Sequence, residues 1–239
     1  MDGLSSVILV QFSILLLAAI VHASLQCDVG SLLLLYHASL GKHIRKKTKS
    51  LVSSYILGAA LLIFLSISAA AFFILTFTGG TFSVISLTVL AAILFALSII
   101  ICFFYYRSKS STELWLPKKV SRHISSRAKL TNNKIEAFNL GMLTAFAETP
   151  FSLILTVLAG NAVLELPTYL QPIGVVVYSF VAILPLFILR FSIRRGSTVV
   201  DIQKWRLKNK TFLKYISGIS FLTLGLFLLA FKILGEKWV

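Results

Sequence analysis

The chain has 239 residues, of which 57% are hydrophobic and only 13% are charged, and its mean hydropathy is +0.91. Soluble globular domains are about 45–50% apolar and about 25% charged, so this composition excludes an ordinary soluble fold. A net charge of +15 would favour nucleic-acid binding in a soluble chain, whereas a membrane protein places such charge at its lipid surfaces. The composition therefore predicts an all-α polytopic membrane protein, whose first partner is the lipid bilayer.

Six apolar blocks are long enough to cross a bilayer as helices, which need about 20 residues each. They cover residues 4–24, 52–77, 81–106, 137–160, 171–193 and 212–231. Thr78-Gly79-Gly80 separates the second block from the third and predicts a tight helical hairpin. Ala159-Gly160-Asn161, Pro167 and Pro172 separate the fourth block from the fifth, and they predict a second short connection over residues 161–170.

The basic residues gather in three hydrophilic segments. Five of the 23 Lys and Arg residues lie in 42–49, eight in 107–134 and eight in 190–214, which makes 21 in total. The positive-inside rule places these segments in the cytoplasm and both termini outside. Segment 107–134 then forms a basic cytoplasmic loop between a first three-helix repeat (1–106) and a second one (135–239). Because orientation and anionic lipid headgroups account for the charge, we expect no nucleic-acid partner.

The first apolar region is too long for one straight span. Residues 4–41 contain a single formal charge, Asp28, and as one helix they would be about 57 Å long, nearly twice the hydrocarbon thickness. We therefore predict a break within residues 22–30, followed by a re-entrant segment over 31–41. A signal peptide cleaved after Val21-His22-Ala23 is a weaker interpretation, because no basic residue precedes the apolar core.

The two halves share a weak internal similarity. Aligning Phe12 with Phe138 also pairs His22 with Glu148, and each of these polar residues accompanies a helix-weakening element. The element is Gln26 to Gly30 in the first half and Glu148-Thr149-Pro150 in the second. Three spans per half make the copies antiparallel, and matching interrupted helices point to a transporter's binding site. We therefore predict six transmembrane helices in two inverted three-helix repeats, with broken helices one and four.

Glu148 is the most informative polar residue. It lies midway along its apolar block, where a carboxylate is costly and usually marks a solute or proton pathway. Pro150 removes a backbone donor and frees a carbonyl about one turn earlier. The predicted binding site comprises Glu148, Thr149, Pro150, His22, Gln26 and Cys27. The alternative is that Glu148 is protonated and hydrogen-bonds the kinked backbone.

A metal site is a separate hypothesis for the same region. Imidazole, thiolate and carboxylate groups from His22, Cys27, His37 and Glu148 suit a transition ion. Their spacing matches no compact ligand motif, so the sequence leaves a metal undecided.

Three stretches resemble the lysine-exporter (LysE) superfamily, whose relatives include thiol transporters of the CcdA and DsbD type. They are Phe138-Asn139-Leu140-Gly141 through Glu148-Thr149-Pro150, Gly174 to Leu184-Pro185, and Lys214 to Leu224-Gly225-Leu226. The resemblance implies six spans in two inverted repeats, and solute export across a prokaryotic plasma membrane. The chain departs from the amino-acid exporters in having no proline in its first helix, and from the thiol transporters in having no cysteine in its fourth.

The sequence thus predicts a secondary transporter, an exporter of a small polar or cationic solute such as an amino acid or a metal ion, with no enzymatic activity and no cofactor. One alternative is a thiol–disulfide electron transporter in which Cys27 works with Cys102, since such proteins need two reactive cysteines. The other is a non-transporting membrane assembly protein. The solute, the coupling ion, the direction of transport and the presence of a homo-oligomer are left open.

Overall fold

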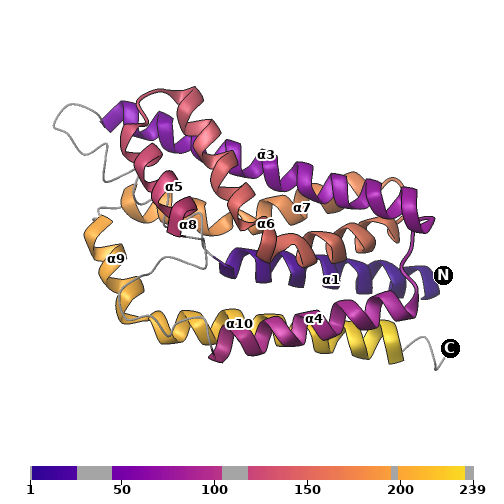
Figure 1. Ribbon diagram of the computed structural model, residues 1–239. Helices are drawn as coiled ribbons and strands as arrows, with labels where there is room; N and C mark the ends of the chain where they lie inside the picture. The colour runs from indigo at the N-terminus through magenta and orange to yellow at the C-terminus, as the bar shows by residue number, and fades with distance from the viewer. Residues whose placement is uncertain (1, 26–44, 104–117, 195–198, 235–239) are drawn as a thin grey trace.

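The computed structural model describes residues 2–25, 45–103, 118–194 and 199–234, and in these residues it is built from helices and short turns (Figure 1). The helices are α1 (Asp2–Leu25), α3 (Arg45–Thr78), α4 (Val84–Phe103), α5 (Lys118–Leu130), α6 (Lys134–Leu164), α7 (Gln171–Ala182), α8 (Leu184–Arg194), α9 (Val199–Lys208), α10 (Lys210–Leu228) and the π-helical η1 (Leu229–Leu234). The all-α prediction is confirmed for this part of the chain.

Five helical segments are long and apolar enough to cross a membrane. They are Ser5–Leu25, Lys49–Thr78, Val84–Phe103, Lys134–Leu164 and Thr211–Phe231. Helices α7 and α8 add a sixth if they count as one span, which bends by 42° at the break between them. The described chain therefore has the long apolar helices that the composition predicted, and the fifth apolar block contains a bend between α7 and α8.

One proline does not have the predicted effect, and a second lies next to a break that was not predicted. Helix α6 runs without interruption through Pro150, so the expected break of the fourth helix is wrong. The fifth span instead ends one helix at Ala182 and begins another at Leu184, immediately before Pro185. A proline inside a helix lacks one hydrogen bond and crowds the carbonyl four residues earlier. Helix α6 tolerates this because α3 packs against it on both sides of Pro150, at Gly141 and at Gly160.

The two predicted connections also differ in outcome. The turn at Gly79 and Gly80 is confirmed, with φ angles of 75° and 110° that only glycine adopts without strain. The second connection is shorter than predicted, because α6 continues past Gly160 to Leu164. Asn161 does not end the helix, since its side-chain amide bonds Glu165 Oε1 in the next turn at 2.7 Å.

The N-terminal prediction is tested only in part. Helix α1 is continuous through His22 to Leu25, so no break lies within its described residues. The remainder of the predicted break, with Gln26 and Cys27, and the re-entrant segment 31–41 lie outside the described residues.

The basic segments contain helices that the sequence did not predict. Residues 107–134 include α5, in which Ile124 and Ala128 are buried while Arg122 and Arg127 are exposed. Helix α5 packs against α6, because its apolar face is too small to be stable alone in water. Helix α5 thus occupies Lys118–Leu130 within the predicted loop segment 107–134, and α9 occupies part of 190–214.

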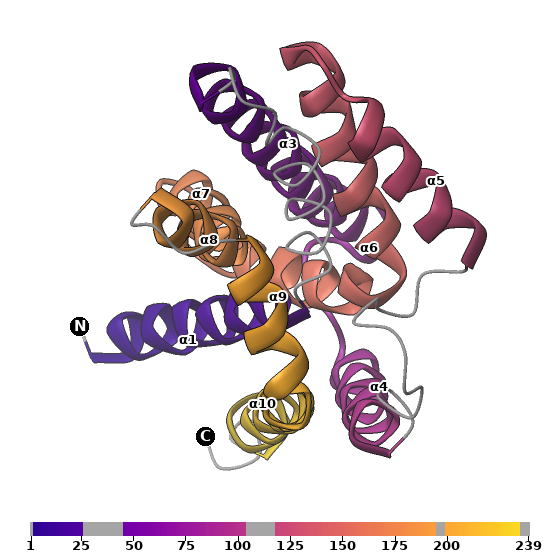
Figure 2. The same cartoon turned by 90° about the vertical axis from the view of Figure 1, so that its left-hand side faces the viewer.

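The long helices form two close pairs, α3–α6 and α4–α10, and α1 packs against α6, α7 and α10 (Figures 1 and 2). Gly58 of α3 lies against Phe138 of α6 and Gly160 of α6 lies against Ala71, so α3 and α6 run in the same direction. Helices α1 and α7 are also parallel, since Leu15 contacts Gly174 and His22 contacts Tyr178. Helices α4 and α10 run in opposite directions, with Gly218 against Cys102 and Gly225 against Phe95.

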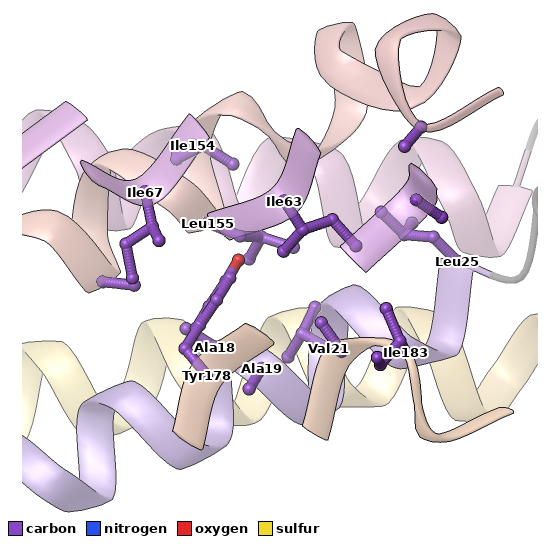
Figure 3. Close-up of a cluster of buried hydrophobic side chains, with 14 of the residues drawn as sticks. Ala18, Ala19, Val21, Leu25, Ile63, Ile67, Ile154, Leu155, Tyr178 and Ile183 are labelled. Carbon is purple, nitrogen blue, oxygen red and sulfur yellow. The ribbon is translucent and has the colours of Figure 1, made fainter. Parts of the chain in front are cut away.

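The bundle has two chemically different ends. The α3–α4 turn, the α6–α7 connection and the first turn of α1 lie at one end, called the turn end here (Figure 1). The basic helices α5 and α9 lie at the other, called the basic end. Between them, α1, α3, α6 and α7 enclose an apolar core that includes Ala18, Ile63, Leu155 and Tyr178 (Figure 3).

Candidate functional site

A row of buried polar side chains runs along α6. Its members, called the α6 polar row, are Thr144, Glu148, Ser152 and Thr156. Residues four apart lie on neighbouring positions of one helix face, so the row turns only slowly around α6. In an otherwise apolar helix, such a row provides a polar surface inside the bundle.

Glu148 faces the interior from the middle of this helix. It is the fifteenth of the 31 residues of α6 and is only 3% exposed. Gly141 and Leu155, seven residues to either side, lie on the same helix face. Gly141 contacts the Tyr55 backbone of α3, and Leu155 belongs to the core cluster of Figure 3. The carboxyl group is therefore placed among helices, away from the outer surface of the bundle.

The hydroxyl groups of the row use their hydrogens on their own helix. Ser152 donates to the Glu148 carbonyl at 3.3 Å and Thr156 donates to the Leu153 carbonyl at 2.8 Å. The Thr144 hydroxyl donates to the carbonyl of Leu140. A hydroxyl that has donated its hydrogen still has an oxygen that accepts hydrogen bonds. Together with the Glu148 carboxylate, the row therefore offers mainly hydrogen-bond acceptors.

His22 does not pair with Glu148. Its Nδ1 lies 2.9 Å from the hydroxyl of Tyr178 on α7, and the two rings meet edge to face with centroids 5.8 Å apart. Within the described residues, no hydrogen bond joins His22 to Glu148. The prediction that His22 belongs to the polar interior is consistent with its burial, but its direct partner is a tyrosine that the sequence did not single out.

A second buried tyrosine makes a comparable contact on the other parallel pair. Tyr55 of α3 donates its hydroxyl to Thr144 Oγ1 of α6 at 3.0 Å. Both Tyr55 and Tyr178 are completely buried, and each hydrogen-bonds a polar residue of the other half of the chain. A tyrosine within an apolar block was the available signal, because the phenol must find a partner when buried.

The other predicted site residues have varied positions. Thr149 is half-buried and Pro150 is exposed on the outer side of α6, so neither faces the interior as Glu148 does. Gln26 and Cys27 lie outside the described residues. Among the residues that the structure describes, no three His, Cys, Asp or Glu side chains gather as a metal site would require. Cys102 lies against Gly218 at the α4–α10 contact.

The structure also reveals a polar cluster that the sequence did not indicate. At the turn end, Gln11 Nε2 of α1 donates to Glu165 Oε2 at 2.6 Å. Asn161 Nδ2 donates to Glu165 Oε1 at 2.7 Å, and Asn161 Oδ1 accepts the backbone N–H of Phe82 at 3.0 Å. Gln11 is the only amide side chain in residues 4–24, and Glu165 is the only acid in 161–170. Their isolation among apolar residues was a signal in the sequence that both side chains need polar partners, although it could not identify those partners.

Comparison with known proteins does not identify the chain. No family model, curated protein or solved structure matches it. The chemistry of the site is therefore the basis for inferring function: a carboxyl group and hydroxyl oxygens inside a helical bundle can bind a cation or a protonated amine.

Proposed function

We propose that this protein is a secondary membrane transporter that moves a small cationic solute, a metal ion or an amine-bearing amino acid, with Glu148 as its binding or coupling group. The observation that carries the proposal is the burial of the Glu148 carboxyl in the α6 polar row, midway along a membrane-length helix. An ionisable group is expensive to keep in hydrocarbon and is usually retained there for transport or proton relay.

The hydrogen bonds of the row favour a cation over an anion. Ser152 and Thr156 donate to backbone carbonyls, which leaves their oxygens as acceptors about one and two helical turns beyond Glu148. An ammonium group or a metal ion needs acceptors, whereas a carboxylate or phosphate needs donors. The row therefore matches solutes that carry positive charge at the bound group.

The packing of the helices supports an inverted repeat. Exchanging the halves would exchange α1 with α6, α3 with the bent pair α7–α8, and α4 with α10. The pair α3–α6 would then map onto α7–α1, and both pairs are parallel. The antiparallel pair α4–α10 would map onto itself. This arrangement agrees with the resemblance to the lysine-exporter superfamily and with alternating access around a site between two halves.

The proposed topology places the basic end in the cytoplasm and the turn end outside. Exposed Arg122, Arg127 and Lys129 of α5 lie at the basic end, where anionic headgroups would attract them. The host membrane would be a prokaryotic plasma membrane, and export remains the proposed direction, both on the basis of the family resemblance. No described contact favours the thiol–disulfide alternative, because Cys27 lies outside the described residues.

A ligand screen on the purified protein tests the proposal. Thermal unfolding is measured with a panel of amino acids and metal ions, using the wild type, Glu148→Gln and Glu136→Gln. Glu136 is the matched control, since it is an exposed acid in the first turn of the same helix. A bound solute at 100 times its Kd should stabilise the wild type by about 2.7 kcal/mol. We expect Glu136→Gln to keep this shift and Glu148→Gln to lose it.

The pH dependence of uptake into proteoliposomes provides the functional readout. Replacing Glu148 by glutamine removes the titratable group, so any transport that remains in Glu148→Gln should no longer vary with pH through this group. A Glu148→Gln protein that inserts normally and transports at the wild-type rate at every pH would contradict the proposal. A panel with no stabilising member and no transported solute would favour an assembly protein instead.

A further inference from the structure

The turn-end cluster joins parts of the chain that are distant in sequence. Gln11 and Glu165 are 154 residues apart, and Phe82 and Asn161 are 79 residues apart. Gln11 and Phe82 belong to the first three-helix half, whereas Asn161 and Glu165 belong to the second. Three hydrogen bonds therefore connect α1, the α3–α4 turn and the end of α6 at one point. We call these four residues the turn-end network.

The network lies at the end of the helix that carries Glu148. Glu165 is 17 residues beyond Glu148, which places it about 25 Å away along α6 at 1.5 Å per residue. The α6 polar row extends from Glu148 toward this end through Ser152 and Thr156. A solute that travels along the row in this direction would meet the network last.

The chemistry of the network suits a contact that opens and closes. Gln11 and Asn161 are almost completely buried, and their amide groups bond a carboxylate that is only half-buried. When such a contact separates and water enters the opening, water can replace each hydrogen bond, so the separated state is not strongly penalised. An apolar contact at the same place would expose hydrocarbon surface to water on opening, which is costly.

On the basis of the proposed function, we infer that the Gln11–Glu165–Asn161–Phe82 network is the gate that closes the solute pathway at the turn end. In the conformation described here the gate is shut. Outward opening requires the Gln11–Glu165 and Phe82–Asn161 bonds to break, while Asn161 and Glu165 stay together on the second half.

Site-directed thiol labelling tests this gate without needing a solute. Thr156, a buried member of the α6 polar row between Glu148 and the network, is replaced by cysteine in a Cys27→Ser, Cys102→Ser background. A membrane-impermeant thiosulfonate is then added separately to each face of sealed vesicles. Gln11→Leu or Glu165→Gln should raise the labelling rate from the turn-end face about tenfold, the ratio expected when one hydrogen bond no longer favours the closed state.

Gln171→Leu is the matched control variant. The Gln171 side chain also donates to backbone carbonyls near this connection, at 3.4 Å to Leu164 and 3.2 Å to Leu166, but these bonds stay within the second half. Its removal should leave labelling at the wild-type rate. Thermal unfolding is measured for both network variants. Labelling is interpreted only for a variant that unfolds like the wild type, so a folding defect in one of them does not affect the test.

The outcomes separate the gate from the transport proposal. If folded Gln11→Leu and Glu165→Gln proteins label as slowly as Gln171→Leu, the network is only a structural contact and the gate is overturned, even if Glu148→Gln abolishes solute binding. If labelling accelerates in the network variants while Glu148→Gln binds and transports normally, the turn end does open at this network and the proposed role of Glu148 fails.

Discussion

The α3–α6 and α4–α10 pairs both place glycine at a helix contact, but the glycines meet different atoms. A Cβ on Gly141 would lie 2.1 Å from the Tyr55 carbonyl oxygen, and a Cβ on Gly58 would lie 2.1 Å from the Phe138 carbonyl oxygen. Backbone therefore touches backbone between α3 and α6, as in membrane helix pairs that approach through small residues.

In the α4–α10 pair the glycines accommodate side chains. A Cβ on Gly218 would meet Cys102 Sγ at 2.3 Å, and a Cβ on Gly225 would meet the Phe95 ring at 2.9 Å. A side chain can rotate away, whereas a helix backbone can move only as a whole. The comparison indicates that the backbone contact between α3 and α6 leaves little room for local adjustment, while the α4–α10 contact can be adjusted by side-chain rotation.

The largest effect is expected from Gly141→Ala. The added methyl group would force α3 and α6 apart, and overpacking of this kind costs on the order of 3 kcal/mol of unfolding free energy. The measurement is unfolding in mixed detergent micelles. Asn139→Ala, at an exposed position on the same helix, is the control and should be nearly neutral. Equal stability of the two variants would show that the α3–α6 contact is less rigid than the distances indicate.

A smaller loss of stability, which a second substitution should partly restore, is expected from Gly218→Ala. Its methyl group conflicts with one side-chain sulfur, so we expect a loss of about 1 kcal/mol, at the low end for overpacking. Adding Cys102→Ala should remove the conflict and recover part of this loss. The four proteins of the double-mutant cycle, compared by the same unfolding assay, measure the coupling. Strictly additive effects would mean that Gly218 and Cys102 do not conflict.

The smallest effect is expected from Tyr55→Phe. The variant removes the hydrogen bond from Tyr55 to Thr144 but leaves the close backbone contact at Gly141 intact. Side-chain hydrogen bonds between membrane helices average about 0.6 kcal/mol, so the loss should be of that size. Thr144 keeps its bond to the Leu140 carbonyl. A loss as large as that of Gly141→Ala would mean that hydrogen bonding, and not backbone packing, holds the pair together.

Features that depend on a short stretch of chain were predictable. The Gly79-Gly80 turn follows from the need for positive φ, and the long apolar helices follow from hydrophobic length. The burial of Glu148 also followed from its position within an apolar block. The helix through Pro150 was not predictable, because it depends on how α3 packs against α6 on both sides of that residue.

By itself, the sequence determined where apolar helices form and which ionisable side chain lies within them, since hydrophobicity and local backbone preference act over a few turns. Only the tertiary structure decided which polar groups face each other: His22 with Tyr178, Tyr55 with Thr144, and Gln11 with Glu165. These partners are separated by 89 to 156 residues. Their pairing depends on the relative placement and rotation of whole helices, which many weak packing contacts set together.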